Sequence, residues 1–167
     1  IVVLDGAMGT RLMEHQPTPA DFGGTKLENC NENLCRTHPE WILEVHRDYL
    51  AAGADILKTN SFQGSPIVLA EFGIEDQAKT LGVLAAKLAR QAAAEFSTSA
   101  KPRFVAGSMG PTTKSLTLRA DVSFRQLSEG YYIQAQGLLV LKRGYWVVES
   151  RLHHCLDITL REDDSRV

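Results

Sequence analysis

The chain has 167 residues, 44% of them hydrophobic and 23% charged, which is the composition of a globular domain long enough to bury a core. A formal net charge of −2 argues against binding to nucleic acids or to a membrane surface, and no apolar run is long enough to span a bilayer. Three cysteines, an odd number, disfavour a disulfide framework and predict a reducing, cytoplasmic setting.

The first predicted element is a buried parallel strand over residues 1–4, an apolar and mostly β-branched run that ends at Asp5. The loop that follows, residues 5–10, contains two glycines, which allow close approach to a ligand or a positive φ and let backbone N–H groups turn toward an anion. Asp5 is placed to hold a cation such as an amine. Amide donors beside a carboxylate suit an amino acid, which carries both charges. The alternative is a tight strand-to-helix turn in which Asp5 is structural.

A helix is predicted next, because Thr37 and Glu40 form a capping-box pattern and Gly53 provides a stop. A second strand follows over residues 55–59. It ends in a polar cluster of Thr59, Asn60 and Ser61.

Two further helices are predicted, over residues 67–72 and over residues 76–96, the second being alanine-rich and amphipathic. A third strand over residues 103–107 then leads into residues 108–113, a loop of small and polar residues. A last helix, from a capping box at Ser123 to about residue 138, completes the pattern. Each polar, glycine-containing loop follows the carboxyl end of a strand, where parallel α/β folds place their active sites.

Three of these segments, residues 5–10, 52–62 and 105–111, resemble the homocysteine-binding domain of homocysteine S-methyltransferases. Within that family they are most similar to the N-terminal module of cobalamin-dependent methionine synthases, and the likeness covers residues 1–139. The family is a (β/α)8 barrel, which typically needs ~250 residues. The resemblance therefore implies an α/β chain that forms the N-terminal half of a TIM barrel, with three to four βα units.

The resemblance also implies a substrate site. Homocysteine would be held by its amino and carboxylate groups, through Asp5 and the backbone of Gly6, Ala7 and Met8. A second wall of the pocket, at the end of the second strand, would be formed by Thr59, Asn60 and Ser61. A third wall would be formed by residues 107–111. The alternative for residues 59–61 is ordinary hydrogen bonding at the end of a strand.

The reaction implied is transfer of a methyl group to the homocysteine thiol to give methionine. In the family, a zinc ion held by three cysteine thiolates activates the thiol, and the methyl group comes from a cobalamin or a methylated sulfur donor. The sequence does not indicate which methyl donor is used, nor whether folate- and cobalamin-binding modules accompany this chain.

The likeness ends after Leu139, and residues 140–167 form a divergent C-terminal segment. Residues 145–150 are a candidate fourth strand, in which Glu149 stands where the family has a pocket glutamate. A change of reading frame or a misjoined gene model would produce such a break. The family's zinc cysteines lie on later strands of the barrel, and Cys30, Cys35 and Cys155 do not match them. We therefore expect free thiols, weak or no zinc binding, and no methyl transfer by this chain alone.

A half barrel has two unpaired strand edges, so it must self-associate, pair with another fragment, or be marginally stable. One alternative function is a non-catalytic half-barrel, or an assembly partner, that retains an amino-acid pocket. Another is an unrelated barrel enzyme that uses residues 6–9 as a phosphate nest. Against the latter, phosphate sites in barrels usually form after the seventh and eighth strands.

Overall fold

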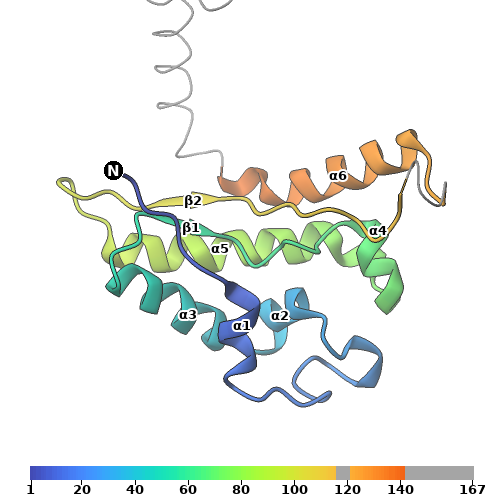
Figure 1. The fold of residues 1–167 in the computed structure, drawn as a ribbon, viewed down its shortest axis with the longest axis horizontal. Coiled ribbons are helices and arrows are strands. Elements are labelled where there is room, and N and C mark those ends of the chain that lie inside the picture. The colour runs from blue at the N-terminus through green and yellow to red at the C-terminus, as the bar shows by residue number, and fades with distance from the viewer. Residues whose placement is uncertain (116–120, 142–167) are drawn as a thin grey trace, which may run out of the picture.

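The computed structural model describes residues 1–115 and 121–141. These residues form a mixed α/β fold around a short parallel sheet of β1 (Ile56–Lys58) and β2 (Phe104–Ala106) (Figure 1). Ile56 lies opposite Phe104 in this sheet, and Lys58 lies opposite Ala106. The N-terminal segment continues the sheet on the other side of β1, because Leu4 forms a parallel bridge with Ile56. The three predicted strand positions thus lie side by side, parallel and in chain order, as expected from the sequence.

Asp55 joins the three strand positions at their amino ends. Its carboxylate accepts a hydrogen bond from the N–H of Val3 at 3.0 Å, and it forms an ion pair with Arg103 at 3.0 Å. Val3 is 52 residues from Asp55 and Arg103 is 48 residues from it, so the two contacts hold together the amino ends of three segments that are distant in the sequence. The carboxyl ends of the strands consequently face the same edge.

Helices provide the connections that parallel strands require. The α-helices are α1 (Met8–Met13), α2 (Leu34–Thr37), α3 (Pro39–Ala51), α4 (Pro66–Leu69), α5 (Ala78–Phe96) and α6 (Phe124–Leu138). Short 3₁₀ turns occur at Thr25–Leu27, Asn31–Asn33, Ala70–Phe72, Glu75–Gln77 and Leu139–Leu141. Among the described residues, no helix is both long and apolar enough to cross a membrane. The candidate strand at residues 145–150 lies outside the described residues.

The helix boundaries follow local signals with one exception. Ser123 and Gln126 form the predicted capping box of α6, and Gly73, at φ 69°, ends the turn that follows α4. The capping box predicted at Thr37 and Glu40 is wrong. Thr37 is the last residue of α2, and its hydroxyl donates to the carbonyl of Asn33, four residues back, so it is not free to cap α3. The residue that precedes α3 is His38 instead.

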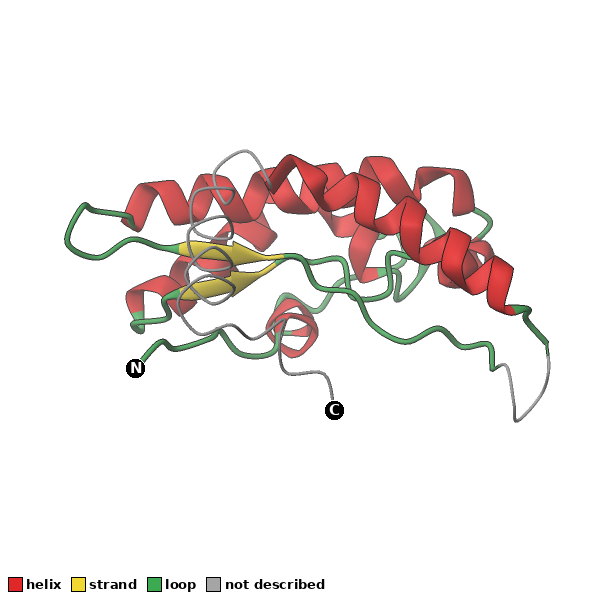
Figure 2. Ribbon diagram, turned by 90° about the horizontal axis from the view of Figure 1, so that it is seen from above, coloured by secondary structure: helices red, strands yellow, loops and turns green. Residues whose placement is uncertain are grey.

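The predicted burial of residues 1–4 is also wrong. The side chains of Val2, Val3 and Leu4 are between 48% and 65% exposed. Figure 2 shows the reason: the long helices lie along one side of the two strands, and the N-terminal segment runs along the other. Leu57 is fully buried because it packs against Leu50 and α5, whereas residues 1–4 receive no covering layer from the described part of the chain.

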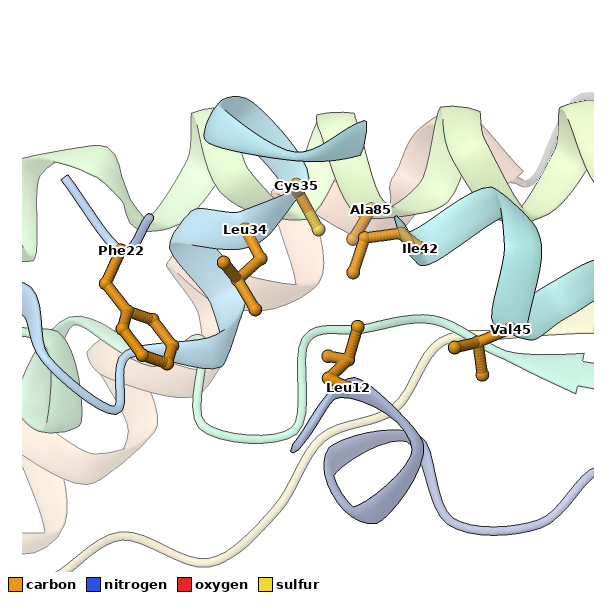
Figure 3. Packing of buried hydrophobic residues seen from close by; sticks show 7 residues of the cluster. All are labelled: Leu12, Phe22, Leu34, Cys35, Ile42, Val45 and Ala85. Atoms are coloured by element: carbon orange, nitrogen blue, oxygen red, sulfur yellow. The ribbon is translucent and has the colours of Figure 1, made fainter. Parts of the chain in front are cut away.

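The main core lies between α1, α2, α3 and α5. Leu12 of α1 is fully buried there, against Ile42 and Val45 of α3 (Figure 3). Burial of one such leucine contributes about 2 kcal/mol to folding. This packing holds α1 against α3 and so fixes the position of the loop that precedes α1.

Candidate active site at the carboxyl ends of the strands

Asp5 lies at the carboxyl end of the first strand position, and its side chain is only 2% exposed. One oxygen, Oδ2, accepts a hydrogen bond from the backbone N–H of Lys58 at 2.9 Å. The other, Oδ1, lies 3.6 Å from the Nζ of Lys58 and has no hydrogen-bond partner among the described residues. Burial raises the pKa of the Asp5 carboxyl, although the N–H and ammonium of Lys58 act in the opposite direction. Asp5 thus retains one oxygen that can accept a hydrogen bond.

The glycine-containing loop is held by Tyr49, which extends from α3. The Tyr49 hydroxyl donates to the carbonyl of Ala7 at 2.9 Å. Neither Gly6 nor Gly9 has a positive φ, so the reason for glycine here is close approach alone. None of the hydrogen bonds found among the described residues uses the N–H of Gly6 or Ala7. These two donors follow Asp5 directly in the chain, while Met8 begins α1 and packs on the main core.

The predicted cluster after β1 is buried, and its hydroxyls bond to each other and to the loop after β2. The Oγ1 of Thr59 and the Oγ of Ser61 are 2.6 Å apart. Thr59 Oγ1 accepts from the N–H of Ser108 at 2.9 Å, and Ser61 Oγ donates to the carbonyl of Ser108 at 2.8 Å. The structure therefore brings the loops after β1 and β2 together through these three residues.

Asn60 points toward the helical layer. Its Nδ2 donates to the carbonyl of Asn31 at 2.8 Å and lies 3.5 Å from the Sγ of Cys35. The fully buried Gln134 of α6 donates to the carbonyl of Ser61 at 2.6 Å. The cluster is therefore bonded both to the segment of residues 31–35 and to α6. Glu149, the remaining predicted site residue, lies outside the described residues.

Sequence reasoning missed three residues that shape this region: Lys58, Tyr49 and Gln134. The sequence contains a signal for Lys58. Successive side chains of a strand point to opposite faces, so a residue next to the core-facing Leu57 points away from the core. Tyr49 lies near the apolar face of its helix, where the sequence favours a core role, and nothing in the sequence indicates that its hydroxyl reaches Ala7. Gln134 lies within an otherwise ordinary helix, with no local pattern to distinguish it.

The described residues do not provide a zinc site. Cys30 and Cys35 are free and buried, and burial raises the pKa of their thiols to about 11 and about 12. Zinc binds the thiolate form, which these environments disfavour. No group of three or more His, Cys, Asp or Glu side chains within residues 1–115 and 121–141 could hold a metal ion. Cys155 lies outside these ranges.

Parallel strands with polar loops at their carboxyl ends define an α/β protein of the class that places its active site at this edge. A family model described as "Homocysteine S-methyltransferase" matches residues 2–151. The chain belongs to the homocysteine S-methyltransferase family, which confirms the resemblance identified from the sequence.

Individual relatives agree with this assignment. The chain is 40% identical to methionine synthase from Mycobacterium leprae (strain TN) over 139 residues, which cover 83% of this chain and 11% of that protein. Crystal structures of the homocysteine methyltransferase MmuM from Escherichia coli, in its oxidized and metallated forms, each match with a TM-score of 0.66. Their sequence identities are 30% and 31%, and each match covers 84% of this chain and 50% of MmuM. The chain thus spans about half of MmuM and a much smaller part of methionine synthase.

Proposed function

We propose that the chain provides the homocysteine-binding half of a (β/α)8 barrel that transfers a methyl group to the homocysteine thiol, giving methionine. Family membership and the parallel strand order support the barrel. The observation that carries the proposal is the buried Oδ1 of Asp5, which accepts no hydrogen bond from the described residues and is followed in the chain by the unused N–H groups of Gly6 and Ala7. An acceptor and donors in this arrangement match the two charged groups of an amino acid.

Asp5 is assigned to the substrate ammonium. Its side chain is nearly excluded from water, and a charge-assisted hydrogen bond is stronger in such an environment than at a protein surface. The N–H groups of residues 6–8 are assigned to the substrate carboxylate, because backbone donors that are not used within the fold are available to an anion. The site therefore orients the amino acid by its two charges and leaves its thiol free.

Thr59, Asn60 and Ser61 are assigned to the second wall of the pocket, with residues 107–111 as the third. The hydroxyls of this cluster are satisfied by Ser108 and by each other, so their contribution is to hold the two loops at a fixed separation. Glu149 keeps its assignment to the pocket on the resemblance alone.

Methyl transfer to a thiol requires that the thiol lose its proton. The resemblance assigns this step to zinc and the methyl group to a cobalamin or methylated sulfur donor. The described residues do not fit such a metal, so the part assigned to them is substrate binding and orientation only.

A second candidate is a non-catalytic half-barrel that retains the amino-acid pocket and acts as an assembly partner. The exposed apolar side chains of Val2, Val3 and Leu4 favour it, because such a face is normally covered by another layer. In this case self-association occurs through the unpaired edges of the sheet.

Calorimetric titration with L-homocysteine tests the proposal, with inorganic phosphate as the comparison ligand. Binding of homocysteine without binding of phosphate supports an amino-acid site. Binding of phosphate alone contradicts it and favours the phosphate nest. Analytical ultracentrifugation of the same samples shows whether binding accompanies self-association.

A further inference from the structure

Lys58 is the last residue of β1 and lies on the face of the strand opposite the helical layer. Its neighbour Leu57 is fully buried against Leu50 and α5. Because successive side chains of a strand point to opposite faces, Lys58 extends away from that layer. Its side chain is 38% exposed, so a ligand at the carboxyl edge of the sheet can reach it.

The ammonium of Lys58 and the carboxylate of Asp5 form an ion pair that leaves bonding capacity on both groups. The Nζ lies 3.6 Å from Oδ1, and that oxygen accepts no hydrogen bond from the described residues. An ammonium has three donors, and no other ion pair of the described residues uses Lys58. The exposed ammonium of Lys58 therefore stands at the proposed site next to the buried carboxylate of Asp5.

An α-amino acid carries its own two charges on neighbouring atoms. Placed against this pair, its ammonium would meet Asp5 and its carboxylate would meet Lys58, so that each charge has an opposite neighbour. We propose that Lys58 is a specificity-determining residue that binds the substrate carboxylate together with the N–H groups of residues 6–8, while Asp5 binds the substrate ammonium. This inference rests on the proposed function, since it assigns a role within the same site.

The competing role for Lys58 is to neutralise Asp5 without touching the ligand. The positive charge of Lys58 favours the ionised form of the Asp5 carboxyl against the effect of burial. If that were its only role, removing Lys58 would weaken recognition of an ammonium more than recognition of a carboxylate. Ligands that carry one charge each therefore separate the two roles.

The test compares Lys58→Met with wild type and with Lys87→Met, which changes an exposed lysine of α5. Three thiols are titrated by calorimetry at neutral pH, where an amine carries its proton and a carboxyl group of a small ligand has lost its proton. They are L-homocysteine, 4-mercaptobutanoate, which lacks the ammonium, and 3-aminopropanethiol, which lacks the carboxylate. Lys58→Met is expected to weaken the first two by about tenfold or more and the third by less than about threefold, because only a carboxylate gains a charge-assisted bond from Lys58. Lys87→Met is expected to change none of them.

Equal affinity of 4-mercaptobutanoate for wild type and Lys58→Met overturns the inference, even when homocysteine binds and the proposed function stands. A greater loss for 3-aminopropanethiol than for 4-mercaptobutanoate also overturns it, in favour of the neutralising role. Lys58-dependent binding of 4-mercaptobutanoate without binding of homocysteine supports the carboxylate site and contradicts the proposed function. Absence of binding for all three ligands contradicts both.

Discussion

The ring of Tyr49 lies so close to Gly6 that a Cβ at position 6 would be 2.7 Å from the Tyr49 hydroxyl oxygen. The same hydroxyl donates to the carbonyl of Ala7, so one side chain of α3 both excludes a larger residue from the loop and fixes its path. Gly6 is thus required by the protein's own packing, next to the residue that the proposed function assigns to the substrate ammonium.

Gly6→Ala is therefore expected to destabilise the protein by about 1–3 kcal/mol, the usual range for overpacking. The ring is held between two parts of the core, which limits its ability to move aside. Urea unfolding measures the change. The cost is expected to fall when Tyr49 is first replaced by leucine, which removes the hydroxyl and the ring. An equal cost of Gly6→Ala in both backgrounds would show that Tyr49 is not the cause.

Gln134 makes a second long-range contact with the site, through its hydrogen bond to the carbonyl of Ser61. Gln134→Leu removes this bond, while the carbonyl keeps the hydrogen bond from the N–H of Gly64 at 3.0 Å, so the expected cost is about 0.5–1.5 kcal/mol of stability. Gln136→Leu, on the same helix and only half-buried, is the matched control, with an expected change within about 0.5 kcal/mol. Equal costs for the two variants in urea unfolding would mean that the bond to Ser61 contributes nothing.

His46 makes stability dependent on pH. It is fully buried with no hydrogen-bond partner among the described residues, and burial lowers its pKa from 6.5 to about 4. The unfolded chain binds a proton below about pH 6.5, whereas the folded protein does so only near pH 4. Stability is thus present in full above pH 6.5 and falls as the pH drops toward 4, by up to about 3 kcal/mol.

Unfolding free energies measured from pH 7 to pH 4.5 test this dependence, with His46→Leu as the comparison. The variant lacks the titrating group, so its stability is expected to fall less steeply over this range. Parallel curves for the two proteins would assign the acid sensitivity to other groups.

Much of the fold could be predicted from the sequence because its signals are local. The alanine-rich segment gives α5, the capping box at Ser123 gives α6, and the three strand positions follow from short apolar runs that end in polar loops. The burial of residues 1–4 could not be predicted in the same way. An apolar run favours burial, but whether a second layer covers it depends on parts of the fold that lie far away in the sequence.

The candidate site was predicted less completely for the same reason. Asp5 and the residues after β1 stand at strand ends, where the sequence pattern is informative. The bond between Asp5 and Lys58 joins residues that are 53 positions apart, and its geometry follows only from the register of the sheet. The failed capping box at Thr37 shows how one residue with two possible partners defeats a local pattern: α2 ends there, and the hydroxyl bonds within α2.

Asn60→Ala is expected to weaken homocysteine binding only modestly, by on the order of 1 kcal/mol. Its amide nitrogen already donates to the carbonyl of Asn31, so its contact with the substrate is at most a neutral hydrogen bond, which water can replace. Calorimetric titration measures the change. A loss as large as the one expected for Asp5→Asn would show that Asn60 itself contacts the charged groups of the substrate.

Homocysteine titration of wild type and Asp5→Asn tests the central claim most directly. A carboxylate bonded to an ammonium in a buried cleft contributes about 1.5–3 kcal/mol, so Asp5→Asn is expected to weaken binding roughly 10- to 100-fold. Thermal unfolding of the same two proteins shows whether the fold is retained. Equal affinities, accompanied by a lower melting temperature for Asp5→Asn, would contradict the account and leave Asp5 with a purely structural role beside Lys58.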